Sequence, residues 1–273
     1  MADTWSPSHA RVIETAGAIG TSASNTAQKR TMSSPTPDIP GNSAIVRVQN
    51  LSVTLDRRTI LHDVSFDIFE GECLAVIGPN GSGKTILLKS LLGILPYEGT
   101  ATWREGVTIG YVPQKIEADR SVPLDVRNLL RAKAAVIGCP PDAVAATATL
   151  VGLPADLLST QIGKLSGGQF QRALIAFALL GDPDIVFFDE PTASIDEQGE
   201  EQIYDLIERL RRDLGLTAVI VSHDVSFVSR HATRVLCVSR AGHCFGLPRG
   251  ALTADVLADL FGTPGVYQHV GHP

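Results

Sequence analysis

The sequence predicts an α/β fold in which short buried strands alternate with helices, and three observations lead to this prediction. An apolar run, Cys73–Ile77, enters a glycine-rich turn. The turn is followed by Thr85–Leu92, whose apolar residues recur at helical spacing. A second apolar run, Ile185–Phe188, ends in the acids Asp189 and Glu190. Short apolar runs of this kind are typical of strands in a parallel sheet, which is buried on both faces.

The glycine-rich turn matches the phosphate-loop pattern G-x-x-x-x-G-K-[ST] without a gap. Glycines let successive backbone N–H groups point at phosphate oxygens, and the helix that follows adds its positive end. Lys84 is expected to reach the β- and γ-phosphates of a nucleotide, and the Thr85 hydroxyl to bind Mg²⁺. An ordinary strand-to-helix turn is the alternative, which the complete match in this context disfavours. The matching residues are Gly78, Pro79, Asn80, Gly81, Ser82, Gly83, Lys84 and Thr85.

Asp189 and Glu190 come at the carboxyl edge of the predicted sheet, where α/β folds bind ligands. Asp189 is expected to hold Mg²⁺, directly or through water. Glu190 is expected to polarise the attacking water as a general base. Two solvated acids at a strand end are the alternative, which the phosphate loop upstream disfavours.

Four further short matches follow in order, and together they indicate a family. They are Gln114 in Tyr111–Gln114, the segment Leu165–Gln169, the segment Ala193–Asp196, and His223 in Val221–Asp224. With them the chain resembles an ATP-binding-cassette ATPase, the nucleotide-binding subunit of an ABC transporter, over roughly residues 44 to 245. The resemblance implies a P-loop NTPase (RecA-like) core with an antiparallel β lobe and an inserted helical subdomain. It also implies ATP hydrolysis with Mg²⁺.

Cassettes of this family pack head to tail, so the resemblance implies a homodimer in which each ATP touches both copies. Ser166 is predicted to cap a helix over Gln169–Leu180, and Gly167 and Gly168 to let the backbone approach the partner's phosphate. Gln169 completes this signature motif.

The remaining roles also come from the resemblance. Gln114 is expected to sense the γ-phosphate through Mg²⁺ or water, and His223 to contact the γ-phosphate and position the water. Asp196, in the D-loop, is assigned to the nucleotide site. The catalytic set is therefore Glu190, His223 and Gln114, and the Mg²⁺ ligands are Thr85, Gln114 and Asp189.

Two positions depart from the family pattern. Ile86 stands where a second hydroxyl residue usually touches the α-phosphate. Leu55 stands where an aromatic residue usually stacks on adenine, or the chain has no stacking residue at all. An aromatic stack contributes about 1–3 kcal/mol in other nucleotide sites. We therefore expect an active ATPase with weaker nucleotide binding, at which GTP competes better than usual.

The domain organisation follows from composition. Residues 1–43 are rich in Ser, Thr, Ala and Pro without periodicity, which predicts a disordered extension. The ATPase domain is assigned to 44–245, with the helical subdomain at about 116–165, and a C-terminal tail to 246–273. The predicted lobe strands are Val46–Leu55 and Ile60–Ile68, the later sheet strands Ala218–Val221 and Arg234–Val238, and the helices Leu124–Leu130, Asp142–Val151 and Glu200–Leu210.

Composition excludes several classes of protein. The chain of 273 residues has a net charge of −6 and no basic stripe, which argues against nucleic-acid binding. No apolar stretch reaches the length of about 18 residues that a membrane span needs. The four cysteines lack C-x-x-C spacing and are expected to be small core residues in a reducing cytoplasm.

Local similarity points to the transported substrate. The stretches Leu92–Gly99 with Trp103, Ile109–Lys115 and Leu260–Gly262 resemble zinc and manganese uptake cassettes. The partners so implied are integral membrane permease subunits and an extracytoplasmic metal-binding protein, with this chain at the cytoplasmic face of the membrane. His269 and His272 are expected to lie in a solvated tail, with metal binding as the alternative. An exporter ATPase, or a cassette protein acting on nucleic acid or ribosomes, remains the alternative function.

Overall fold

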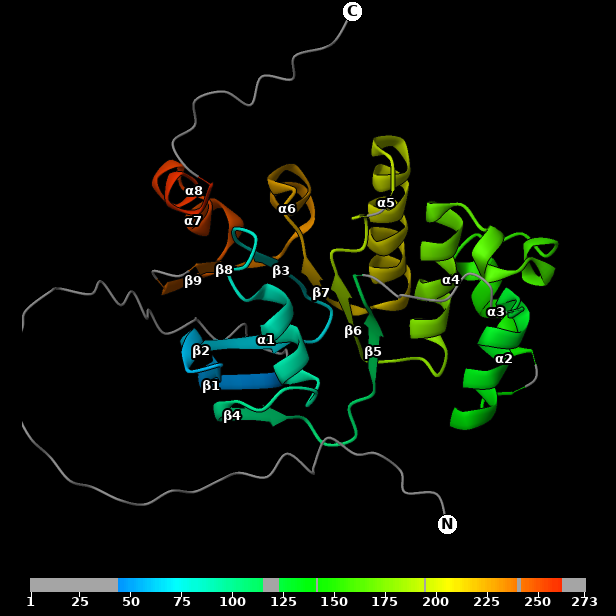
Figure 1. The fold of residues 1–273 in the computed structure, drawn as a ribbon, viewed down its shortest axis with the longest axis horizontal. Helices are drawn as coiled ribbons and strands as arrows, with labels where there is room; N and C mark the ends of the chain where they lie inside the picture. The colour runs from blue at the N-terminus through cyan, green and yellow to red at the C-terminus, as the bar shows by residue number, and fades with distance from the viewer. Residues whose placement is uncertain (1–43, 115–122, 141, 194, 240–241, 262–273) are drawn as a thin grey trace, which may run out of the picture.

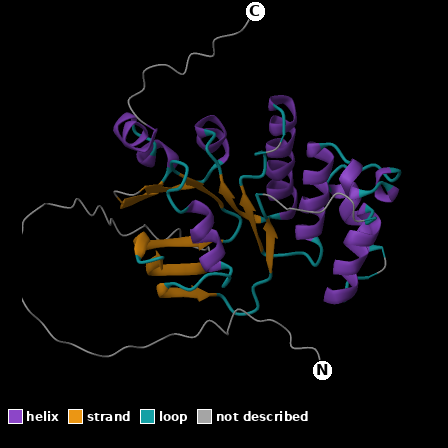
Figure 2. Cartoon of the chain, in the orientation of Figure 1, coloured by secondary structure: helices purple, strands orange, loops and turns teal. Residues whose placement is uncertain are grey.

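The structure, a computed structural model, describes residues 44–114, 123–140, 142–193, 195–239 and 242–261. Within these ranges a six-stranded sheet lies beside a three-stranded antiparallel sheet (Figure 1). A group of helices stands at one end of the larger sheet (Figure 2). The α/β fold with an antiparallel lobe is therefore confirmed.

Two predictions fall outside the described residues. They are the disordered extension 1–43 and the end of the tail with His269 and His272. In the part of the chain that is described, no helix combines the length and apolar character needed to cross a membrane.

The larger sheet carries the predicted buried strands, and its neighbouring strands are parallel except for the last pair. Its strands in spatial order are β5 (Ile109–Val112), β6 (Ile185–Asp189), β7 (Thr217–Val221), β3 (Cys73–Ile77), β8 (Arg234–Ser239) and β9 (Gly242–Gly246). Side chains of β3 alternate between two hydrophobic clusters, with Ala75 and Ile77 on one face and Leu74 and Val76 on the other. Burial on both faces explains why these strands are continuous apolar runs.

The antiparallel lobe packs over the second of these clusters, together with α1 (Lys84–Leu91). Its strands are β1 (Ala44–Leu55), β2 (Arg58–Phe69) and β4 (Glu98–Trp103). β1 and β2 start two residues before the predicted strands. The sequence did not reveal β4, because most of its residues are exposed or half-buried and carry no clear apolar alternation.

The helices of the predicted helical subdomain begin and end at local signals. Within its predicted bounds of about 116–165 lie α2 (Val126–Ile137), α3 (Ala143–Leu150) and the short 3₁₀ helices η2 (Leu157–Ser159) and η3 (Ile162–Lys164). The next helix, α4 (Gly167–Leu179), begins just beyond the predicted end. The Asp125 carboxylate caps α2 by accepting from the Asn128 backbone N–H at 2.7 Å. Gly138, with φ 71°, ends it. α2 is longer than predicted because its last turn packs Ala134 into the core although its outer face is exposed.

The C-terminal half adds four helices around the sheet, α5 (Glu197–Leu214), α6 (Val225–His231), α7 (Pro248–Ala251) and α8 (Ala254–Phe261). The last two lie in the segment assigned to the tail from residue 246. Ala251 and Leu260 are buried in the first hydrophobic cluster, so this part of the segment packs on the domain. Neither helix was predicted from the sequence, and α7 packs against β8 and β9.

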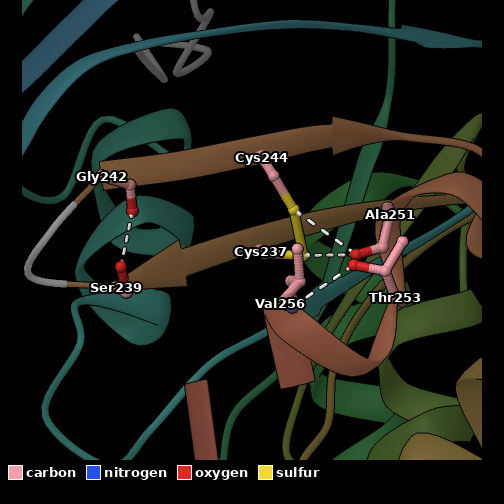
Figure 3. Close-up of a disulfide and its surroundings, with 7 residues drawn as sticks. All are labelled: Cys237, Ser239, Gly242, Cys244, Ala251, Thr253 and Val256. Carbon is pink, nitrogen blue, oxygen red and sulfur yellow. Dashed lines mark hydrogen bonds between the residues drawn. A yellow bond between two sulfur atoms is a disulfide. The ribbon is translucent and has the colours of Figure 1, made fainter. Parts of the chain in front are cut away.

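The cysteines differ in part from expectation. Cys73 and Cys139 are free thiols, but Cys237 and Cys244 form a disulfide between β8 and β9 (Figure 3). The two residues face each other across the antiparallel pair, with a Cα–Cα distance of 4.9 Å. The prediction of four unpaired core cysteines is therefore wrong for this pair. The spacing in sequence carried no signal, because the pairing depends on the register of two strands.

A thiol count checks the disulfide. Protein purified without reductant and unfolded in guanidinium should expose two reactive thiols, Cys73 and Cys139, of the four cysteines in the chain. Reduction before unfolding should raise the count to four. In the folded protein Cys73 should not react at pH 8, because burial raises the pKa of its thiol to about 12. Four thiols without reductant would contradict the pairing.

Candidate functional site

The phosphate loop lies between β3 and α1, at the carboxyl edge of the sheet. The Lys84 ammonium is buried and donates to the carbonyls of Gly78 and Pro79 at 2.9 and 3.1 Å. Burial lowers the pKa of Lys84, and the nearby Glu190 and Asp189 carboxylates act against that shift. The amine is thus held at the centre of the loop, where phosphates are bound in such turns.

Two features of the loop fit a bound phosphate. A Cβ on Gly78 would lie 2.0 Å from the Val238 carbonyl oxygen, so only glycine allows β8 to approach the loop this closely. The Ser82 hydroxyl is buried and has no hydrogen-bond partner in the described structure. A buried polar group without a partner is costly, and a phosphate oxygen would satisfy it.

Asp189 lies at the foot of the loop, at the end of β6. The Thr85 hydroxyl donates to Asp189 Oδ1 at 2.9 Å, and the Tyr111 hydroxyl donates to Asp189 Oδ2 at 3.4 Å. Burial raises the pKa of Asp189, and the Thr85 hydrogen bond opposes the shift. Mg²⁺ prefers oxygen ligands, and the Thr85 hydroxyl and the Asp189 carboxylate lie side by side. The predicted pair of ligands therefore fits this cation.

Glu190 follows directly and faces different partners. Gln114 Nε2 donates to Glu190 Oε2 at 2.6 Å, and Lys84 Nζ lies 3.9 Å from Glu190 Oε1. The Glu190 backbone has φ 46°, and its N–H donates to the Val221 carbonyl of the neighbouring strand. Its carboxylate is thereby held beside the phosphate loop and the predicted glutamine.

Tyr111 is a site residue that sequence reasoning did not assign. The alternation of strand side chains could have found it. Tyr111 belongs to the same face of the sheet as Phe187, which it pairs with across β5 and β6. Asp189 follows Phe187 by two residues and so points to this face as well, where α1 carries Thr85.

His223 lies at the same sheet edge, two residues beyond the end of β7. Its side chain is exposed, and within the described ranges it has no hydrogen-bond or ion-pair partner. The Asp224 carboxylate next to it caps α6 by accepting from the N–H groups of Ser226 and Phe227. The strand end and the cap fix the backbone on both sides of His223 and leave its imidazole accessible.

The predicted signature residues gather elsewhere, around a separate hollow. Ser166 Oγ accepts from the Gln169 backbone N–H at 3.3 Å, and Gln169 Oε1 accepts from the Ser166 N–H at 3.0 Å. This capping box starts α4 two residues earlier than predicted. Asp196 caps α5 by accepting from the Gly199 N–H at 3.1 Å.

Both helix starts line one hollow of about 380 Å³. The positive ends of two helices therefore open into the same space, which favours an anion there. Ser166, Gly168 and Asp196 thus come together, but none of the lining residues belongs to the phosphate loop. Arg172 also lines the hollow and was not predicted. Ser194, in the predicted D-loop, lies outside the described residues.

Known proteins with similar sequences and structures identify the family. The profile of the ABC transporter family matches residues 61–193. The zinc import ATP-binding protein ZnuC of Roseobacter denitrificans is 39% identical over 221 residues, covering 81% of this chain and 85% of the relative. The chain belongs to the ABC transporter family.

Two further likenesses agree with this membership. ZnuC of Cereibacter sphaeroides is 41% identical over 222 residues, covering 80% of this chain and 88% of the relative. A solved structure described as an inward-facing conformation of a metal-chelate type ABC transporter matches with a TM-score of 0.73 and 26% identity. That match covers 80% of this chain and 89% of the other.

The two departures from the ABC pattern lie in β1 and α1. Leu55 ends β1, and Ile86 lies in the first turn of α1. Both side chains are half-buried and pack against the second hydrophobic cluster. Neither offers a ring face or a hydroxyl to a nucleotide.

Restoring the aromatic residue should strengthen nucleotide binding. Leu55→Tyr is expected to lower the KM for ATP by about fivefold or more, because a base stack contributes about 1–3 kcal/mol. GTP hydrolysis should compete well in the unaltered chain. Parallel ATP and GTP kinetics on both proteins measure this. A strong preference for ATP in the unaltered chain would contradict the expectation.

Proposed function

We propose that this chain is the ATP-hydrolysing subunit of a zinc importer and acts through a separate membrane permease. The observation that carries the proposal is the meeting of the phosphate loop with Asp189 and Glu190 at one sheet edge, each acid held by its own donor. Relatives named as zinc import ATP-binding proteins support the substrate.

In the proposed reaction Lys84 and the loop N–H groups bind the β- and γ-phosphates of ATP. Lys84 exchanges its bonds to the Gly78 and Pro79 carbonyls for phosphate oxygens. Thr85, Asp189 and Gln114 would hold Mg²⁺, which offsets phosphate charge when it is bound. Each of these groups is already positioned, so little ordering is needed when ATP binds.

Glu190 then acts as the general base. The water oxygen attacks the γ-phosphorus, its proton passes to the Glu190 carboxylate, and the bond to the ADP oxygen breaks. Gln114, which donates to Glu190 at 2.6 Å, links the base to the γ-phosphate site. The accessible His223 contacts the γ-phosphate and positions the water.

The second half of each site comes from another copy of this chain. The hollow lined by Ser166, Gly168 and Asp196 offers two helix starts to an anion, but it has no lysine or loop of its own for phosphate. A γ-phosphate held by the loop of a partner cassette fits this hollow. A homodimer packed head to tail would thus enclose two ATP molecules.

Gly168→Ala tests the dimer. A Cβ on Gly168 meets nothing within 4 Å in one chain, so the variant should fold and bind ATP normally. Hydrolysis should fall about tenfold or more, because the methyl group would face the partner's phosphate and cost at least about 1.4 kcal/mol. Gly250→Ala is a matched control, since its Cβ also meets nothing within 4 Å. Equal turnover in the two variants would contradict the proposed contact.

We further assign an ATPase domain that begins at about residue 44 and includes α7 and α8, which pack on its core, with its helical subdomain facing the permease at the cytoplasmic side of the membrane. An extracytoplasmic zinc-binding protein would deliver the metal. The acidic net charge of −6 supports a partner other than nucleic acid.

The decisive experiment is reconstitution in vesicles with the membrane permease of the same transport system. ATP hydrolysis should be stimulated by a zinc-loaded binding protein. Zinc should accumulate on the side of the vesicle membrane that carries the ATPase subunit. Manganese-loaded and iron-chelate binding proteins are the comparisons. Stimulation by only one of those binding proteins would assign its metal as the substrate in place of zinc. Efflux of metal would favour an exporter, and indifference to every binding protein would overturn the proposal.

A further inference from the structure

Three hydroxyl groups lie in a row in the interior, between the segment that carries Glu190 and the one that carries His223. Tyr204 Oη lies 3.4 Å from Thr192 Oγ1 and 2.9 Å from Ser222 Oγ. Exposure of these side chains is low, at 4% for Thr192, 5% for Tyr204 and 1% for Ser222. A buried polar chain of this kind fixes the groups at its two ends relative to each other.

One end of the row is tied to the catalytic carboxylate. Thr192 lies in the turn that Glu190 begins, which is closed by the Ala193 N–H donating to the Glu190 carbonyl at 3.2 Å. The Thr192 hydroxyl donates to Glu200 Oε1 at 2.7 Å. Because the single Thr192 hydroxyl proton is used in the bond to Glu200, the Thr192 oxygen can only accept a hydrogen bond from the Tyr204 hydroxyl.

The other end is tied to His223 on both sides. Ser222 precedes His223, and its Oγ accepts from the Asp224 backbone N–H at 2.9 Å. The ring of Tyr204 stacks on that of Phe227, with centroids 3.8 Å apart and planes 16° apart. Tyr204 therefore contacts Ser222, directly before His223, and Phe227, four residues after it. Burial raises the pKa of the Tyr204 hydroxyl, which keeps it protonated as a donor.

We propose that Tyr204 is a positioning residue, which holds His223 in register with Glu190 through Ser222 and Thr192. The inference rests on the proposed function, since it assumes that these two residues act together on ATP. In the described structure no group forms a hydrogen bond or ion pair with the His223 imidazole. The position of the imidazole therefore depends on the backbone of His223. A misplacement of about 1 Å can cost about 100-fold in rate.

Tyr204→Phe tests the role, because it removes the hydroxyl and keeps the ring stacked on Phe227. In the protein purified with its permease, kcat for ATP hydrolysis should fall about 5- to 50-fold, with KM changed by less than about twofold. Ser222→Ala removes the partner oxygen and should give the same pattern. Tyr97→Phe is the control: Tyr97 is half-buried, whereas Tyr204 is buried, and it lies outside this row. Its kcat should stay within about twofold of the unaltered protein.

A second background separates positioning from stability. In a protein that already carries His223→Ala, adding Tyr204→Phe should lower kcat by less than about twofold. The effects of two substitutions are not additive when one residue acts through the other. Multiplicative losses would overturn the role, as would a rise in KM with a lowered Tm. An unchanged kcat in Tyr204→Phe would overturn the role alone. Absence of hydrolysis in the unaltered complex would overturn the proposed function as well.

Discussion

Glu190→Gln is expected to abolish steady-state ATP turnover and to leave ATP binding intact. The carboxylate accepts from Gln114 at 2.6 Å, and Lys84 Nζ lies 3.9 Å from its other oxygen. Glutamine has the same shape and keeps one oxygen as an acceptor for Gln114, but its amide cannot take a proton from water. Loss of a general base costs about 10²–10⁴ in rate.

The variant should also accumulate as a dimer with ATP bound, since ATP molecules enclosed between the two copies would stay in place until they are hydrolysed. Phosphate release, ATP binding by calorimetry and mass by light scattering measure the three properties. Glu201→Gln, at an exposed position of α5, is the control and should keep normal turnover. Near-normal turnover in Glu190→Gln would refute the general-base assignment.

Lys84→Ala should remove most of the affinity for ATP. The amine is buried at the centre of the loop, between the Gly78 and Pro79 carbonyls. Burial lowers its pKa, yet Glu190 and Asp189 favour its charged form. Hydrogen bonds to charged groups contribute about 1.5–3 kcal/mol each, so the affinity should fall about 10- to 150-fold for a single lost bond.

The loss should be specific to this lysine. Lys164→Ala, at an exposed position before the signature segment, should bind ATP normally. Calorimetric titration of both variants with Mg-ATP compares them, and circular dichroism checks that each is folded. Equal affinities in the two variants would argue that the loop binds phosphate through its backbone alone.

The local parts of this protein follow from its sequence because their physical causes are local. The run Cys73–Ile77 becomes β3 within its predicted bounds, since an apolar run without polar breaks suits a strand buried on both faces. The start of α4 likewise has a local cause: Ser166 is its N-cap, as predicted, although the helix begins two residues earlier than expected and the reciprocal bond to Gln169 was not predicted.

Contacts between distant segments were decided by the tertiary structure. The donation of Tyr111 to Asp189, the pairing of Cys237 with Cys244 and the edge strand β4 depend on strand register, which no local pattern records. The row from Thr192 to Ser222 also depends on how α5 packs against the sheet. The sequence by itself thus predicted which groups bind and cleave a nucleotide. Packing of α5 and the strands, because it sets distances of a few ångströms, decided which side chains hold those groups in place.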